Sequence, residues 1–348
     1  MFGLTRAVVA GGLVLGLAGS AVPPRNGTAV RDVLRSCAGF DADDLRTLEE
    51  GEPISRSIPG RDRHEIAVAG AVRMNIPASF FVERLRNIEA FKRSDLVLQI
   101  GRFGERPSLG DLAGLRLNAS DLADLRHCRV GDCDVKLPAA AIERVRLGID
   151  WTRRDAQGRA EDLARQMLLE NTLAYLDGGD AALANYDDKR NAVSPAQELR
   201  LLIPGLNCPG VPEHIRESLA GFPRGGSPTD ESFLYWSNES FGLKTLLSVT
   251  HVTIFPAAPT RPTIIASKGI YSSHYLDASL SLTWLLDVDG GEDPAIDVVY
   301  INRSRVDAFG GAFGRLARSI ASSRQRDGML RELKALRDRL ESDFSSRH

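Results

Sequence analysis

The 348-residue chain lacks the short motifs that identify several common classes of enzyme. It contains neither Gly-x-Ser-x-Gly, which marks many serine hydrolases, nor His-Glu-x-x-His, which marks many zinc proteases. The segment Gly310-Gly-Ala-Phe-Gly314 lacks the Lys-Ser/Thr ending of a phosphate-binding loop, so a turn explains it better. These absences count against an enzyme, although an enzyme can lack all three motifs.

The sequence also has little net charge. Its 44 Lys and Arg residues nearly balance 46 Asp and Glu residues, and the formal charge of −2 gives no reason to expect a nucleic-acid partner. The hydrophobic fraction of 43% and the charged fraction of 26% are those of an ordinary globular protein. No metal-ligand spacing and no cofactor motif is evident, so we expect neither a metal nor a cofactor.

Cysteine is scarce, with 4 residues in the chain. Cys128 and Cys133 lie in one tight loop with Gly131, so a bridge between them would close a short ring and leave Cys37 and Cys208 for a second bridge. Three pairings are formally possible, and spacing alone does not choose between them. The spacing is not Cys-x-x-Cys, which weakens a redox role.

Long apolar runs are limited to the N-terminus. Arg6 precedes an apolar stretch from Ala7 to Ala18, and Gly19-Ser20-Ala21 offers the small residues of a signal-peptidase site. We therefore predict a signal peptide over residues 1–21, cleavage near Ala21, and export to the periplasm or the extracellular space. A retained N-terminal anchor is the alternative.

Hydrophobic periodicity predicts strands in two separate parts of the chain. Residues 65–76 alternate as a half-buried strand does, Pro77 suits the start of a helix, and residues 96–100 resume the alternation. Four more strands are predicted at 245–255, 263–271, 273–287 and 295–302. After Phe309 the period changes to that of one long amphipathic helix.

The intervening part has helical periodicity. Helices are expected at 111–125, 138–151, 159–176, 195–203 and 213–222. We predict an α+β fold, in which a curved antiparallel sheet is closed by the long C-terminal helix. Its parts are an N-terminal lead-in at 22–60, a sheet domain formed by 61–106 and 229–345, and a helical insertion or cap at 107–228.

This order of elements resembles the START-like, helix-grip superfamily, also termed SRPBCC, which includes polyketide cyclase-like proteins. The residues that carry the likeness are 65–100, especially Gly70-Ala-Val-Arg-Met-Asn-Ile-Pro77, and 245–344. The resemblance implies a cavity between the sheet and the final helix that holds a lipid or another apolar ligand. The helical part at 107–228 departs from the compact pattern of the superfamily, so the cavity could be filled or remodelled.

Several residues are candidates for the cavity wall. Phe81 and Trp284 are apolar candidates that could equally be core residues, and Tyr271 and Tyr300 are further candidates. Arg303 could pair with a carboxylate or phosphate at a cavity mouth.

Two histidines are candidates for more specific chemistry. His251 and His274 both lie in predicted strands, and either could bind a head group or act as an acid or base. Asp277 could orient a histidine ring. The alternative to a carrier is therefore a cyclase- or hydrolase-type enzyme that uses these three residues. A further alternative is that they are polar strand residues without a functional role.

The expected partner is an apolar small molecule or a lipid. A basic stretch on the final helix could also contact an anionic membrane surface. The alternative is that it forms the solvent-exposed face of that helix. That stretch comprises Arg315, Arg318, Arg324, Arg326 and Arg331. A third hypothesis is a non-catalytic interaction module of the cell envelope, with residues 107–228 as the contact surface.

Overall fold

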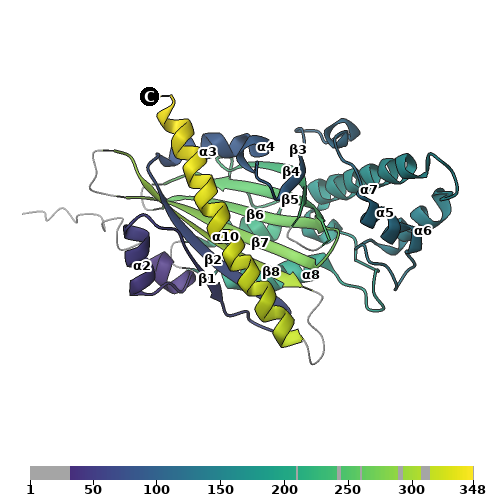
Figure 1. The fold of residues 1–348 in the computed structure, drawn as a ribbon, viewed down its shortest axis with the longest axis horizontal. Helices are drawn as coiled ribbons and strands as arrows, with labels where there is room; N and C mark the ends of the chain where they lie inside the picture. The colour runs from purple at the N-terminus through teal and green to yellow at the C-terminus, as the bar shows by residue number, and fades with distance from the viewer. Residues whose placement is uncertain are drawn as a thin grey trace, which may run out of the picture.

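The computed structural model describes residues 32–208, 211–240, 244–258, 261–288, 293–306 and 314–347, with side chains of the last segment described from residue 326 onward. The predicted signal peptide, residues 22–31 of the predicted lead-in, and the segment Gly310–Phe313 therefore lie outside the described residues. The chain folds into a large antiparallel sheet crossed by a long C-terminal helix, with a group of helices at one side (Figure 1).

The sheet has 8 strands, and every neighbouring pair is antiparallel. The strands are β1 (Ile54–Ile58), β2 (Glu65–Met74), β3 (Val97–Arg102), β4 (Glu231–Glu239), β5 (Leu246–Phe255), β6 (Thr263–Ser272), β7 (Leu276–Asp287) and β8 (Ile296–Val306). Their order across the sheet is β1-β2-β8-β7-β6-β5-β4-β3. β3 and β4 pair although residues 103–230 separate them, so the helical part leaves from one edge of the sheet and returns to it.

The helices fall into three groups along the chain. Before β3 come η1 (Val33–Cys37), α2 (Ala42–Glu49), α3 (Ala78–Arg86) and α4 (Ile88–Phe91). Between β3 and β4 come η2 (Leu109–Leu112), α5 (Ala119–His127), α6 (Ala139–Gly148), α7 (Ala156–Gly178), η3 (Gly179–Ala182), α8 (Pro195–Leu202), η4 (Ile203–Leu206) and α9 (Glu213–Gly221). The last helix is α10 (Gly314–Ser345).

The predicted α+β class, antiparallel sheet and C-terminal helix packed on the sheet are confirmed. β1 and β4 were not predicted, and the single helix expected at 111–125 is the turn η2 followed by α5, which starts where the side chain of Asn118 accepts the backbone N–H of Asp121 at 2.8 Å.

Both faces of the sheet are covered, so β2 is buried on both sides rather than half-buried as its alternation predicted. Val72 and Met74 belong to an apolar core under α3, α4 and α10. Ala69 and Ala71 belong to the core on the opposite face, which also contains the apolar residues of the helical part. The alanines on that face are therefore core residues rather than solvent-facing ones.

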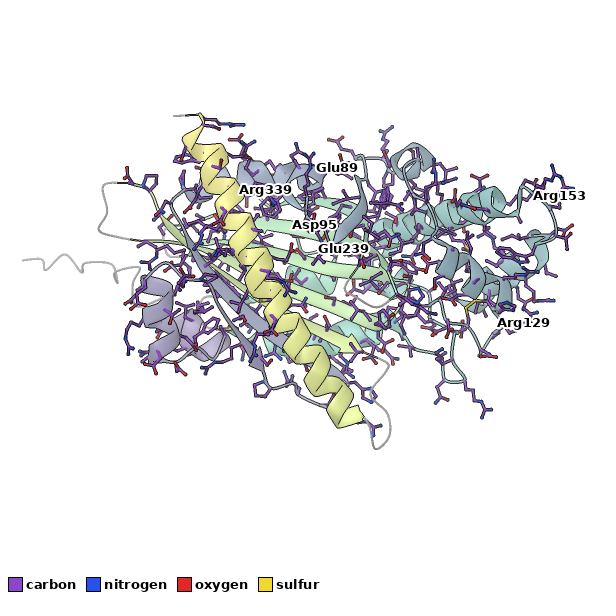
Figure 2. The ribbon with its side chains drawn as sticks, in the orientation of Figure 1. Glu89, Asp95, Arg129, Arg153, Glu239 and Arg339 are labelled. Atoms are coloured by element: carbon purple, nitrogen blue, oxygen red, sulfur yellow. A yellow bond between two sulfur atoms is a disulfide. The ribbon has the colours of Figure 1, made fainter. Side chains whose placement is uncertain are left out.

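The second half of α10 lies directly on β2. A methyl group added at Gly70 would come within 2.5 Å of the sulfur of Met329 and 2.7 Å of Leu333 Cδ1, so only glycine allows this approach without a shift of the helix side chains. Arg339 further ties α10 to the end of α4, because its guanidinium donates to the carbonyls of Phe91 (2.6 Å) and Arg93 (2.8 Å) (Figure 2).

Two disulfides link parts of the fold. Cys128 pairs with Cys133 inside one loop, and Cys37 pairs with Cys208 across 171 residues. Such bonds persist in oxidising environments, which fits an exported protein. Among the described helices, none is both long and apolar enough to cross a membrane.

Candidate ligand-binding site

A small cavity opens on the face of the sheet opposite α10. Its volume is about 110 Å³, and it lies between strands β5 and β6, helix α9 and the loop after α9. Its lining includes Leu219, Phe222, Asp230, His251, Thr253 and Lys268. It combines a few apolar side chains with several polar ones, among them a histidine and a lysine that could fix the orientation of a ligand.

His251 and Lys268 occupy directly opposite positions in the β5–β6 register. Both side chains are almost fully buried, with exposures of 4% and 3%. The alternation of β5 and β6 puts them on the same face as Val249 and Ala266, which belong to the core opposite α10. The sheet therefore fixes two nitrogen-bearing side chains side by side at the cavity wall.

One ring nitrogen of His251 is satisfied and the other is not. Nδ1 lies 2.7 Å from the hydroxyl of Tyr175, whereas Nε2 is buried without a hydrogen-bond partner among the described residues. Burial, and then the charge of Lys268, lowers the pKa of His251 to about 3, so the ring is neutral near pH 7. With the Tyr175 hydroxyl as the donor to Nδ1, the ring proton is on Nε2 and is available to a ligand oxygen.

Lys268 is held by two acceptors. Its Nζ donates to Asp180 Oδ1 at 2.6 Å and to the carbonyl of Leu219 at 2.9 Å. It also lies 5.1 Å from the ring centroid of Tyr175 and 5.8 Å from that of Phe222. Burial lowers the pKa of Lys268, although the Asp180 carboxylate acts in the opposite direction.

The helical part supplies the groups that surround these two residues. Tyr175 is in the last turn of α7, and Asp180 follows in η3. Gly179 joins them with a φ of +64°, and a Cβ there would lie 1.8 Å from the carbonyl oxygen of Phe222. Glycine at this point therefore lets the chain turn against Phe222, whose ring centroid is 4.5 Å from that of His251.

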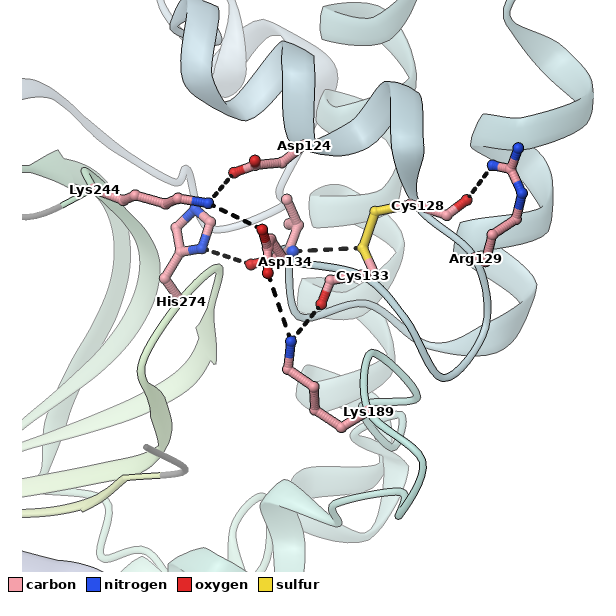
Figure 3. Close-up of a disulfide and its surroundings, with 9 residues drawn as sticks. Asp124, Cys128, Arg129, Cys133, Asp134, Lys189, Lys244 and His274 are labelled. Carbon is pink, nitrogen blue, oxygen red and sulfur yellow. Dashed lines mark hydrogen bonds and ion pairs between the residues drawn. A yellow bond between two sulfur atoms is a disulfide. The ribbon is translucent and has the colours of Figure 1, made fainter. Parts of the chain in front are cut away.

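His274 belongs to a separate polar network near the Cys128–Cys133 disulfide (Figure 3). Its Nδ1 lies 2.8 Å from the backbone oxygen of Asp134, and its Nε2 lies 3.2 Å from Asp121 Oδ1. Ligand atoms of His274, Asp121 and Asp124 lie within 4.8 Å of one another, which is close enough for one metal ion. Lys244 Nζ already contacts Asp124 at 2.7 Å, so one of the two carboxylates has a cationic partner without a metal ion.

The three residues predicted as an acid–base set lie in three different networks. His251 contacts Tyr175, His274 contacts Asp121 and Asp134, and Asp277 accepts a hydrogen bond from Lys136 Nζ at 2.7 Å. Of the three, His251 lines the cavity.

The predicted wall residues are divided between the two faces of the sheet. Phe81 packs against Phe91 in the core under α10, whereas Trp284 is fully buried in the core on the other face. Tyr271 also packs on that other face. They do not line one common cavity.

The two remaining predicted site residues are polar. Arg303 is buried and forms an ion pair with Glu65. Tyr300 is partly buried, and its position two residues from Val298 puts it on the α10 face.

The basic stretch of α10 is described only in part. Arg326 and Arg331 are exposed, and the side chains of Arg315, Arg318 and Arg324 lie outside the described residues.

A larger depression lies beside the C-terminal half of α10. It has a volume of about 340 Å³ and is open to solvent. Its charged lining residues include Arg73, which forms an ion pair with Asp297, and Glu341, which accepts the backbone N–H of Asn75. We give the smaller cavity priority because it contains a buried, unpartnered polar atom.

No protein-family model matches the chain, and a search of the curated proteins finds no match. The interpretation of the site therefore depends on its geometry.

Lys268 was not among the predicted site residues, although its strand contained a signal. Ile264, Ala266 and Ile270 share its face of β6, so the alternation of that segment already placed a lysine among core positions. Tyr175, Asp180 and Phe222 come from the helical part, and no local pattern connects them with β5 and β6.

Proposed function

We propose that this protein is an exported binding protein for a small molecule, and that the cavity beside His251 and Lys268 holds the ligand's head group. The head group would present an oxygen that accepts hydrogen bonds, as a carbonyl or a carboxylate does. The observation that carries this proposal is the buried Nε2 of His251, which lacks a partner in the wall of a cavity. A buried polar group without a partner costs about 1–3 kcal/mol, which a ligand oxygen would offset.

The size of the cavity restricts what it can hold. A water molecule occupies roughly 30 Å³ in the liquid, so 110 Å³ is room for a head group of a few heavy atoms. Any longer part of the ligand would have to lie outside the cavity. The ring of Phe222 supplies aromatic contact in the cavity wall, and Tyr175 stacks against that ring.

A test compares two histidine-to-asparagine variants. Asparagine at 251 keeps an amide near the Nδ1 position for Tyr175 but removes Nε2, so His251→Asn should abolish binding of acetate or acetone measured by ligand-observed NMR. His214 is exposed on α9 and lines neither cavity, so His214→Asn is the matched control and should bind as the wild type does. Equal binding by both variants would contradict the proposal.

A lipid or another apolar ligand between the sheet and α10 is a second candidate. It is supported by the topology: α3 and α4 follow β2, the last strand β8 lies beside β2, and α10 ends the chain, as in the helix-grip superfamily. The close contact at Gly70 leaves little room under the second half of α10 beside Tyr300, the register partner of Gly70, so such a ligand would lie elsewhere on this face of the sheet. Native mass spectrometry of chain from Val22 onward, followed by organic extraction, tests this: a clean mass without lipid uptake contradicts it.

A further inference from the structure

Lys268 differs from two other lysines of the described residues that form ion pairs. Lys92 is partly buried and contacts Glu239, and although burial lowers the pKa of Lys92, the neighbouring Tyr235 and Glu239 raise it. Lys136 contacts Asp277 and lines neither cavity. Lys268 combines a cavity at its amine, a lowered pKa, and a carboxylate partner with one free oxygen, Asp180 Oδ2.

We propose that the ligand of this cavity is an aldehyde or a ketone, and that Lys268 condenses with its carbonyl carbon to form an imine. This inference depends on the proposed function, because it assigns the chemical class of the same head group. A lysine amine in a desolvated site is a common nucleophile toward carbonyl carbon. Each unit by which an amine's pKa falls increases its neutral fraction at pH 7 about tenfold.

The geometry supplies a proton acceptor for the first step. The Lys268 ammonium transfers one proton to the Asp180 carboxylate, whose Oδ1 is 2.6 Å away. The lone pair freed on Nζ then forms a bond to the carbonyl carbon, and the carbonyl π pair moves to oxygen. Phe222 and Tyr175 keep the amine in a water-poor environment while it reacts.

His251 is placed to donate to the carbonyl oxygen. Its Nε2–H hydrogen-bonds that oxygen as negative charge develops. The oxygen then takes one proton from Nζ to give the carbinolamine, and the hydroxyl leaves as water with the proton that Asp180 had accepted, while the nitrogen lone pair forms the C=N bond. The overall change is amine plus carbonyl giving imine plus water, so no oxidant or reductant is needed. A protonated imine keeps a positive charge next to Asp180, which stabilises it.

The test traps the imine in the disulfide-intact chain from Val22 onward. The protein is incubated with propanal and sodium cyanoborohydride at neutral pH, and the propylated fraction of each lysine is measured by peptide mass spectrometry. We expect the fraction at Lys268 to exceed that at the buried control Lys136 severalfold, because a carbonyl compound can enter the cavity at Lys268 whereas Lys136 lines neither cavity. Acetone serves as the ketone probe.

Two variants separate the chemistry from the fold. Lys268→Arg keeps a cation for Asp180 but cannot form the imine, so the intact variant should gain one propyl group fewer than the wild type over the same time. His251→Asn should slow propylation of Lys268 by on the order of 10²-fold, as expected for loss of a hydrogen-bond donor to the developing oxyanion. The matched His214→Asn variant should be labelled at the wild-type rate.

The outcomes distinguish the two proposals. Acetate binding without propylation of Lys268 would leave the binding proposal intact and overturn the imine. Propylation of Lys268 no faster than that of the exposed Lys334 would also overturn it. Absence of both acetate binding and propylation would overturn both proposals.

Discussion

His251 and Lys268 face each other across the β5–β6 ladder, and both side chains are buried on the same side of the sheet. Two basic groups at such a position oppose each other's protonation, and burial disfavours the charged form of both. Asp180 supports the positive charge of Lys268, whereas the described partner of His251 is the neutral Tyr175. His251 is consequently the member of the pair that stays neutral.

The stability of the protein should depend on pH through His251. Its pKa is about 3 in the folded chain and 6.5 in the unfolded chain, so between these values the unfolded chain binds a proton that the folded chain does not. Its contribution is therefore complete above pH 6.5 and decreases as pH falls toward 3. From pH 7 to pH 5 the free energy of unfolding should fall by about 2 kcal/mol from this group.

Urea unfolding of the wild type and of His251→Asn at pH 7 and pH 5 isolates this contribution, because other titrating groups are common to both proteins. We expect the difference between the two free energies of unfolding to shrink at pH 5. A pH-independent difference would show that His251 does not titrate as a buried neutral ring.

Gly179 should be intolerant of any side chain. Alanine there would have a positive φ and a Cβ 1.8 Å from the carbonyl oxygen of Phe222, a backbone atom that cannot rotate away. We expect Gly179→Ala to lower the free energy of unfolding by about 2 kcal/mol or more and to weaken acetate binding. Gly221→Ala, where a Cβ meets nothing within 4 Å, is the matched control. Equal stability of the two variants would show that the contact with Phe222 is not needed.

The C-terminal half of the fold was predictable because its signals are local. The strands from 245 to 302 are separated by Pro-rich and Gly/Asp-rich connectors, and the first of them is rich in β-branched residues. The last helix has its own apolar stripe. β4 was missed although Phe233-Leu-Tyr-Trp236 is an apolar run typical of a strand buried on both faces. The predicted division between the helical part and the sheet domain falls just before it, after residue 228, and the first strand predicted beyond that division begins at 245.

The site was only partly predictable, because it joins residues that are distant in the sequence. His251 was identified from its strand, but its pairing with Lys268 depends on the register between β5 and β6. The contacts with Tyr175 and Phe222 depend on how the helical part folds back on the sheet. Nothing in the sequence distinguished His251, which lines a cavity, from His274, whose Nε2 contacts the carboxylate of Asp121.

Two glycines at α10 should respond to substitution in opposite directions. At Gly70 a larger side chain must displace Met329 and Leu333, so Gly70→Val should cost about 1–3 kcal/mol and increase amide hydrogen exchange in the second half of α10. At Gly328, inside α10, a Cβ meets nothing within 4 Å. Gly328→Ala should therefore stabilise the protein by about 0.5–1 kcal/mol through helix propensity. Destabilisation by both substitutions would contradict this account of the helix contact.

The two disulfides should differ in how much they stabilise the fold. In the chain-entropy model a bridge stabilises by restricting the unfolded chain, and the restriction grows with the length of the closed loop. Cys37–Cys208 spans 171 residues and Cys128–Cys133 spans 5. The model gives about 5 kcal/mol for the first and about 2 kcal/mol for the second.

The measurement is urea unfolding of the paired variants Cys37→Ala/Cys208→Ala and Cys128→Ala/Cys133→Ala, each compared with the wild type. The first pair should show the larger loss, because its bridge joins η1 to the segment after η4, which are far apart in the chain. The second pair should lose less stability while loosening the loop beside His274, seen as faster amide exchange at Asp134. A larger loss in the second pair would mean that local order around Asp121 and Lys244, rather than loop length, determines the contribution of these bridges.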